Sequence, residues 1–163
     1  MVLVRNMKYA DKNKIFELGC QIFREEDEIP LLQKALYSCI HSLSFVAVEG
    51  KEIIGFTLVG KIPTHVYHPF LTKIPNCFEL AFLGINPKCQ GRGLGSRLLK
   101  ETLIAIFQTS VQFTCWLCVD QINQGASRLY EKFGFRRWCA TKNTQVPCNI
   151  MGLSHRRFGF SMI

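Results

Sequence analysis

The chain has 163 residues, an apolar fraction of 48% and a formal net charge of +8. This length and hydrophobic content exclude a disordered chain and favour one globular domain over residues 1–163. The charge suits a nucleic acid or an anionic cofactor, but the basic residues are scattered, so we expect no nucleic-acid partner.

The N-terminal half predicts a mixture of helices and strands. Apolar residues at helical spacing follow Asp11, which we expect to be the N-cap of the first helix. Gly50-Lys51 is typical of a tight hairpin turn. The connection over residues 60–76 is long for a compact domain, which favours a functional role for it. The expected elements are a strand over residues 2–6, helices over 11–22 and 29–42, and strands over 44–49 and 52–59.

In the C-terminal half, strands alternate with helices, which is typical of crossover connections and some parallel pairing. Together with the early hairpin, this alternation predicts an α/β fold with a mixed sheet of about six to seven strands, flanked by about four helices. The expected elements are strands over residues 78–85, 113–119, 135–140 and 158–163, and helices over 93–109 and 123–133.

The sequence also disfavours three kinds of protein: secreted, membrane-spanning and metal-binding. Arg5 and Lys8 follow the short apolar run at the start, unlike the layout of a signal peptide. No segment reaches the ~18 apolar residues of a membrane span, so we expect a soluble, cytoplasmic protein without membrane contact. Cys115 and Cys118 have zinc-like spacing, but no second pair matches them and in a strand they face opposite sides. We therefore expect no metal.

A glycine-rich segment, Gln90-Gly91-Arg92-Gly93-Leu94-Gly95, stands between a predicted strand and a predicted helix. Glycines leave the backbone N–H groups accessible, and a helix N-terminus attracts an anion, so the segment predicts a phosphate cradle. Its spacing matches neither the dinucleotide fingerprint nor the Walker motif. A glycine-rich turn without a ligand is the alternative.

The surrounding residues resemble the GCN5-related N-acetyltransferases. Gln90, Gly93 and Gly95 match that family's Gln/Arg-x-x-Gly-x-Gly/Ala signature, and the run Val119–Phe135 is similar to its V-x3-N-x2-A-x2-L/F-Y-x3-G-F motif. The resemblance covers essentially the whole chain. It implies the GNAT fold and an enzyme that moves an acetyl group from acetyl-CoA to an amine within a ternary complex.

The resemblance also implies a donor site made largely of backbone. The pantetheine arm would pair with the strand before the loop, and the pyrophosphate would lie on the loop amides. Asn123 is either a cofactor contact or a helix cap, and Arg92 is either a phosphate partner or a solvated charge. The expected donor-site residues are Leu83, Gly84, Ile85, Gln90, Gly91, Arg92, Gly93, Leu94, Gly95, Ser96 and Asn123.

Two side chains are the expected catalytic groups. Tyr130 matches the position from which many family members protonate the departing thiolate; the alternative is a structural tyrosine. Glu79 matches the strand glutamate that acts as base in histone-acetylating relatives. Desolvation in an apolar strand would raise the pKa of its carboxyl towards neutrality. His65, His68 or a water relay are the alternatives for the base.

The acceptor is not specified by the motifs. An acidic run, Glu25-Glu26-Asp27-Glu28, and two histidines, His65 and His68, fall in regions that usually shape the acceptor site in this family. Clustered carboxylates attract cations, which favours a small polyamine. A protein lysine or N-terminus is the main alternative, a non-catalytic acyl-CoA sensor is a further one, and a homodimer is left open.

Overall fold

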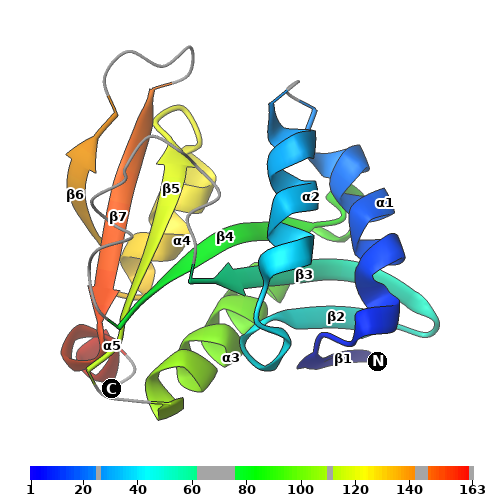
Figure 1. Cartoon of the computed structure of the whole chain (residues 1–163), viewed down its shortest axis with the longest axis horizontal. Coiled ribbons are helices and arrows are strands. Elements are labelled where there is room, and N and C mark those ends of the chain that lie inside the picture. Colours follow the sequence, from blue (N-terminus) through cyan, green and yellow to red (C-terminus); the bar gives the residue numbers. More distant parts are fainter. Residues whose placement is uncertain (25–26, 62–75, 110–111, 142–146, 162–163) are drawn as a thin grey trace.

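The computed structural model describes residues 1–24, 27–61, 76–109, 112–141 and 147–161, and all statements below concern these ranges. Seven strands form one sheet in the order β1-β2-β3-β4-β5-β7-β6 (Figure 1). The strands are β1 (Val2–Asn6), β2 (Phe45–Glu49), β3 (Glu52–Gly60), β4 (Cys77–Ile85), β5 (Thr114–Asp120), β6 (Arg136–Ala140) and β7 (Cys148–Ser154). The helices are α1 (Lys12–Ile22), α2 (Glu28–Ser38), α3 (Leu94–Thr109), α4 (Gln124–Lys132) and α5 (His155–Ser161).

Neighbouring strands are antiparallel except for β4 and β5, which run parallel. These two strands pair only from Cys77 opposite Thr114 to Glu79 opposite Trp116. Beyond that point no described residue of β4 pairs with β5, and the two strands diverge (Figure 1). The sheet therefore opens into a notch in its middle, bordered by the free edges of β4 and β5.

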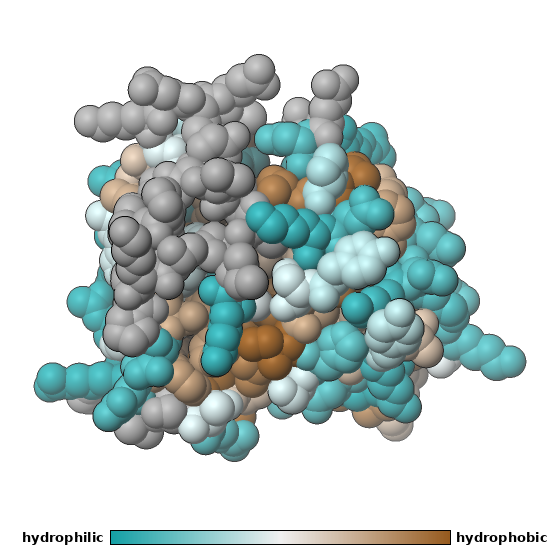
Figure 2. All heavy atoms as spheres, in the orientation of Figure 1, coloured by the Kyte–Doolittle hydropathy of each residue, from teal (hydrophilic) through white to brown (hydrophobic). Residues whose placement is uncertain are grey.

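The helices cover both faces of the sheet. On β2, Val46 belongs to the apolar cluster under α1 and α2, while its neighbours Phe45 and Ala47 belong to a cluster with α3. Because successive strand residues point to opposite faces, α1 and α2 lie on one face and α3 on the other. Figure 2 shows the outer surface over α1 and α2 as mainly hydrophilic with small hydrophobic areas, as expected for amphipathic helices.

A bulge interrupts the pairing of β3 with β4. Val59 pairs with Leu80 and Leu58 pairs with Phe82, so Ala81 is the extra residue. Leu80 packs in the cluster with α3 and α4, whereas both Ala81 and Phe82 belong to the cluster with α1 and α2. The bulge thus turns the end of β4, next to the notch, relative to its beginning.

Most predicted elements are present, but the C-terminus differs. The strand expected over residues 158–163 is wrong: His155–Ser161 is helix α5, and residues 162–163 lie outside the described ranges. The last strand is β7, which was not expected. It lies between β5 and β6, and residues 150–153 are buried in succession, so it lacks the alternation of an edge strand.

Two helix ends also differ from expectation. The second helix ends at Ser38 rather than at residue 42, and a 3-10 turn follows at His41–Leu43. Asp11 precedes α1, but its carboxylate does not cap that helix. It accepts a hydrogen bond from the backbone N–H of Lys8 at 2.7 Å and so caps the 3-10 turn Tyr9–Asp11 instead. No helix in the described ranges is long and apolar enough to cross a membrane.

Candidate active site

The glycine-rich loop joins the end of β4 to the start of α3. A 3-10 turn at Pro87–Cys89 leads into it, capped by the side chain of Asn86. Gly91 and Gly93 have φ values of 76° and 72°, in the left-handed region that favours glycine. Gly95 lies in the first turn of α3 and needs no such conformation, so the first two glycines set the path of the loop.

The backbone amides of this loop form a concentrated set of donors. The six N–H groups from Gly91 to Ser96 donate no hydrogen bond to any described residue. The first N–H bonded back into the helix is that of Arg97, to the carbonyl of Gly93 at 3.1 Å. These amides stand at the positive end of the dipole of a sixteen-residue helix. The arrangement fits a phosphate or pyrophosphate.

The edge of β4 continues this cradle towards the notch. Leu83, Gly84 and Ile85 pair with β3 on one side, opposite Thr57, Phe56 and Gly55. On the other side these three residues lie beyond the last pair with β5, and no described backbone group takes the place of that strand. An extended ligand with amide groups can therefore add to this edge as a strand would.

Three elements meet at the entrance of the cradle. A Cβ atom added at Gly95 would lie 3.4 Å from the side chain of Leu129 in α4 and 3.9 Å from that of Leu83 in β4. Leu129 was not among the predicted site residues. Its position directly before Tyr130, within the second sequence motif, is the signal that could have identified it.

Arg92 and Asn123 both have partners within the protein. Arg92 forms a two-pronged ion pair with Glu49, at 2.6 and 3.2 Å, on the exposed surface. This pair raises the pKa of the guanidinium and lowers that of the Glu49 carboxyl. Asn123 accepts a hydrogen bond from the N–H of Ala126 at 3.1 Å and is the N-cap of α4. Their expected cofactor contacts stay predictions.

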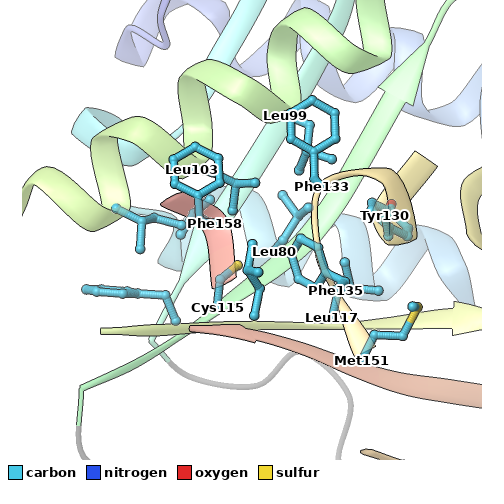
Figure 3. Packing of buried hydrophobic residues seen from close by; sticks show 14 of the residues in the cluster. Leu80, Leu99, Leu103, Cys115, Leu117, Tyr130, Phe133, Phe135, Met151 and Phe158 are labelled. Carbon is cyan, nitrogen blue, oxygen red and sulfur yellow. The ribbon is translucent and has the colours of Figure 1, made fainter. Parts of the chain in front are cut away.

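Tyr130 lies in the apolar cluster between α4 and the diverging strands. It packs beside Phe135, with ring centroids 5.7 Å apart, and shares the cluster with Leu80 of β4 and Leu117 of β5 (Figure 3). Burial raises the pKa of its hydroxyl well above the ordinary value. The hydroxyl has no hydrogen-bond partner among the described residues. The hydroxyl is therefore protonated and neutral throughout the physiological range, and its expected catalytic role stays a prediction.

Glu79 occupies the point at which β4 and β5 separate, opposite Trp116. Glu79 is only 1% exposed, so it is not a solvated surface residue. Along the strand it shares a face with Ala81, the face covered by α1 and α2, whereas Tyr130 belongs to the cluster on the opposite face. The two expected catalytic groups thus stand on opposite faces of the sheet at the apex of the notch.

The residues expected to bind the acceptor are only partly described. Asp27 is exposed immediately before α2, and Glu28 is half-buried in its first turn, where acidic side chains stabilise the helix dipole. This position gives both a structural reason for being acidic. Glu25, Glu26, His65 and His68 lie outside the described residues. Among the described residues, no group of three His, Cys, Asp or Glu could hold a metal ion.

Comparison with known proteins identifies the family and the fold. Residues 12–135 match the family model described as the acetyltransferase (GNAT) family. The chain belongs to the GNAT family. The fold predicted from the sequence is confirmed by its similarity to solved structures, among them that of the NatC complex bound to Gag peptide and CoA. That chain has a TM-score of 0.76 and 16% identity, with 94% of this chain and 98% of the other covered.

Two GNAT relatives are more similar in sequence. The mycothiol acetyltransferase of Salinispora arenicola is 37% identical over 58% of this chain, and the match spans only 33% of that protein. The chain matches between 22% and 33% of the length of the mycothiol acetyltransferases to which it is similar. N-alpha-acetyltransferase RimI of Mycobacterium tuberculosis is 29% identical over 83% of this chain and 79% of its own length. Neither name supports the expected polyamine preference.

Proposed function

We propose that this chain is an acetyl-CoA-dependent N-acetyltransferase whose acceptor is the α-amine of a peptide or protein. The observation that carries the proposal is the free edge of β4 on the same strand–loop–helix segment as the six unpaired amides of Gly91–Ser96. These two features together suit a ligand with amide groups at one end and a pyrophosphate at the other, as in coenzyme A. Membership of the GNAT family supports the same donor.

Acetyl-CoA supplies the acetyl group as a thioester. In the proposed reaction the loop amides hold the pyrophosphate, and the backbone of Leu83–Ile85 holds the pantetheine arm. The acceptor amine loses one proton to Glu79, directly or through water, and a new C–N bond forms as the C–S bond breaks. Tyr130 is the candidate donor of a proton to the leaving sulfur. Its burial makes it a weaker acid than a free tyrosine, so that step needs the departing thiolate close by.

The acceptor class is proposed from the relative that matches most of its own length. The likeness to the N-alpha-acetyltransferase RimI extends over 79% of that protein, compared with 33% of the mycothiol acetyltransferase of Salinispora arenicola. Small amines, including the polyamines expected from the acidic run and sugar-linked amines of the mycothiol type, remain competing acceptors. A single assay can separate these classes.

The assay measures free-thiol release from acetyl-CoA with one acceptor at a time. We expect release with peptides that have a free N-terminus, and none with the same peptides blocked at the N-terminus but containing lysine. Spermidine and glucosamine are the small-amine arms. Preferential turnover of spermidine would restore the polyamine hypothesis. Tight CoA binding without turnover of any acceptor would contradict the proposed enzyme and favour an acyl-CoA sensor.

Tyr130→Phe tests the proposed proton donor. Because Phe keeps the ring packing against Phe135 but lacks the hydroxyl, we expect kcat to fall by about 10²-fold or more. The Kd for CoA, measured calorimetrically, should stay within a factor of about two or three because the site is built from backbone. A variant with unchanged kcat would assign Tyr130 a structural role only.

A further inference from the structure

Phe23 follows the last turn of α1 and covers the end of β4. Its N–H donates to the carbonyl of Gly19 at 2.8 Å, and its extended backbone then leads the chain away from the helix. The ring lies edge-on to Phe82, with centroids 5.0 Å apart, and to Phe56 at 6.4 Å. Phe82 is buried beneath it, whereas Phe23 itself is only half-buried. Phe23 is therefore not fully covered and forms the outer side of this aromatic group.

This aromatic group stands beside the notch. Phe82 and Gly84 belong to the part of β4 beyond Glu79, where pairing with β5 has ended. The end of α1 packs directly on this part of β4, because a Cβ atom added at Gly84 would lie 3.1 Å from Cδ1 of Ile22. Figure 1 shows this end of α1 above β4, on the same side as α2.

The bulge at Ala81 decides which side chains face the acceptor. Because Ala81 is an extra residue, Ala81 and Phe82 follow one another on the face covered by α1. Glu79, two residues before Ala81, lies on that face too. The same face thus offers a buried carboxylate at the apex of the notch and, next to it, the half-buried Phe23 packed over the buried Phe82.

This combination has a chemical meaning for the acceptor. A carboxylate beside an apolar surface suits one amine with a large apolar group attached close to it. A polyamine would bring further ammonium groups against Phe rings, and the loss of their hydration costs more than a cation–π contact returns. An N-terminal residue with a large apolar side chain has no such cost.

We propose that Phe23 and Phe82 select acceptors whose first residue carries a large apolar side chain, such as Met, Leu, Ile or Phe. This inference rests on the proposed N-acetyltransferase function. Burying a side chain of that size on an aromatic surface favours Leu over Ser at the first position by about 10- to 100-fold in kcat/KM. Of these two residues, Phe23 is the one to substitute, because it is half-buried and its removal leaves no cavity in the core, whereas Phe82 is buried.

The test compares peptides that are identical except for a first residue of Leu, Met, Ala or Ser. For the wild type we expect kcat/KM to be highest with Leu and Met. Phe23→Ala should reduce the Leu-to-Ser ratio about tenfold, mainly through a higher KM for the Leu peptide. Phe23→Leu, which keeps most of the volume, should give an intermediate ratio and guards against loss of the fold.

Phe16→Ala is the matched control. Phe16 lies in the same helix and packs half-buried in the same apolar cluster, but it lines a separate cleft of about 270 Å³ between α1 and α2, with Tyr9 and Tyr37. It should keep the wild-type ratio. A wild type that acetylates Ser and Leu peptides equally, or equal ratios in the Phe23→Ala and Phe16→Ala variants, would overturn the inference. A wild type that neither binds CoA nor acetylates any amine would instead overturn the proposed function.

Discussion

Asp11 joins β1 to the turn before α1 through charged hydrogen bonds. Its carboxylate accepts from both terminal nitrogens of Arg5, at 2.7 and 2.9 Å, and from the N–H of Lys8. The hydrogen bonds from Arg5 lower the pKa of the Asp11 carboxyl. A lowered pKa means that the stabilisation is complete above the pKa of an unfolded Asp, about 4, and is lost as the pH falls through the lower folded value.

Asp11→Asn should therefore destabilise the protein in a pH-dependent way. We expect the free energy of unfolding at pH 7 to fall by about 1–2 kcal/mol, and the difference from wild type to shrink as the pH is lowered below about 4. Urea unfolding at pH 7 and pH 3 measures this change. Glu17→Gln, at an exposed position in α1, is the control and should change little at either pH. A difference that is the same at both pH values would contradict the ion-pair explanation.

The glycines of the loop differ in what they require. Ala at position 93 is strained, by about 1 kcal/mol, because Gly93 has a φ of 72°. Ala at position 95 would make ordinary contact with Leu129 and has a better helix propensity. We expect Gly93→Ala to lower Tm and weaken CoA binding more than Gly95→Ala does, as measured by thermal unfolding and calorimetry. A weaker affinity in Gly95→Ala than in Gly93→Ala would show that close approach, not loop path, limits binding.

Residue roles were predictable from the sequence only where they depend on near neighbours. Asn123 was expected to be a cap or a cofactor contact, and its cap depends on a residue three positions away. The cap expected from Asp11 on α1 was wrong. Its carboxylate is held instead by Arg5 and Lys8, which precede it in the chain by six and three positions. The Arg92–Glu49 pair joins residues 43 positions apart, and no local pattern signals it.

At the scale of elements, β3 and α3 are held together across a glycine. A Cβ atom at Gly55 would lie 2.7 Å from Cδ1 of Ile85 and 3.1 Å from both the carbonyl oxygen of Gly84 and Cδ1 of Leu98. Gly55→Ala should lower the free energy of unfolding by about 1–3 kcal/mol, because the backbone of Gly84 must move. Chemical denaturation measures the loss.

Gly125→Ala is the matched control for this prediction. Gly125 is exposed in the first turn of α4, and the nearest atom to an added Cβ is Oδ1 of Asn123 at 3.9 Å. The same substitution should stabilise the protein here by about 0.5–1 kcal/mol. If both alanines stabilise, the close packing of β3 against α3 does not limit stability.

Element types were predictable where apolar spacing was regular. Leu94, Leu98 and Leu99 repeat with helical spacing and lie buried in α3. The C-terminal strand was missed because β7 is buried on both faces and contains Gly152, onto which the Trp138 ring packs. A buried run with a central glycine has no two-residue period, and tertiary contacts decide its conformation.

At the scale of the whole molecule, buried cysteine thiols and the buried Tyr130 hydroxyl make the stability of the fold decrease at alkaline pH. Burial raises the pKa of Cys77 and Cys148 to about 11, and raises that of Cys115 and Tyr130 further. These groups stay protonated in the folded state, whereas unfolded thiols ionise near pH 8.5 and unfolded Tyr near 10. Because their folded pKa values are raised, stability is complete below the unfolded values and is lost as the pH rises above them.

The free energy of unfolding should therefore decline above about pH 8.5, by about 1.4 kcal/mol per pH unit for each fully buried thiol. Cys115→Ala removes one such group and should reduce the slope between pH 9 and 10 by that amount, despite lower stability at pH 7. Denaturant unfolding under reducing conditions measures the slope. Cys20→Ala, at an exposed site, should leave the slope unchanged. An equal slope in both variants would contradict this account.

The notch itself was not predictable from pattern or composition. The sequence predicts β4 and β5 as strands, but nothing in their residues states that pairing ends at Glu79 and Trp116. The notch arises from the bulge at Ala81 and from the clusters on either face, which depend on contacts between distant segments. The resemblance to a family predicted only that a ligand pairs with the strand before the loop.

The six amides of Gly91–Ser96 belong to the main chain, which all residues except proline share. A substitution in this loop can seldom delete a contact, because the donor stays whatever side chain replaces the original one. In a saturation mutagenesis scan the damaging changes would be prolines, which remove an N–H, and non-glycine residues at 91 and 93. The loop can therefore drift in sequence while it keeps its ligand, and two chains with 16% identity can share this architecture.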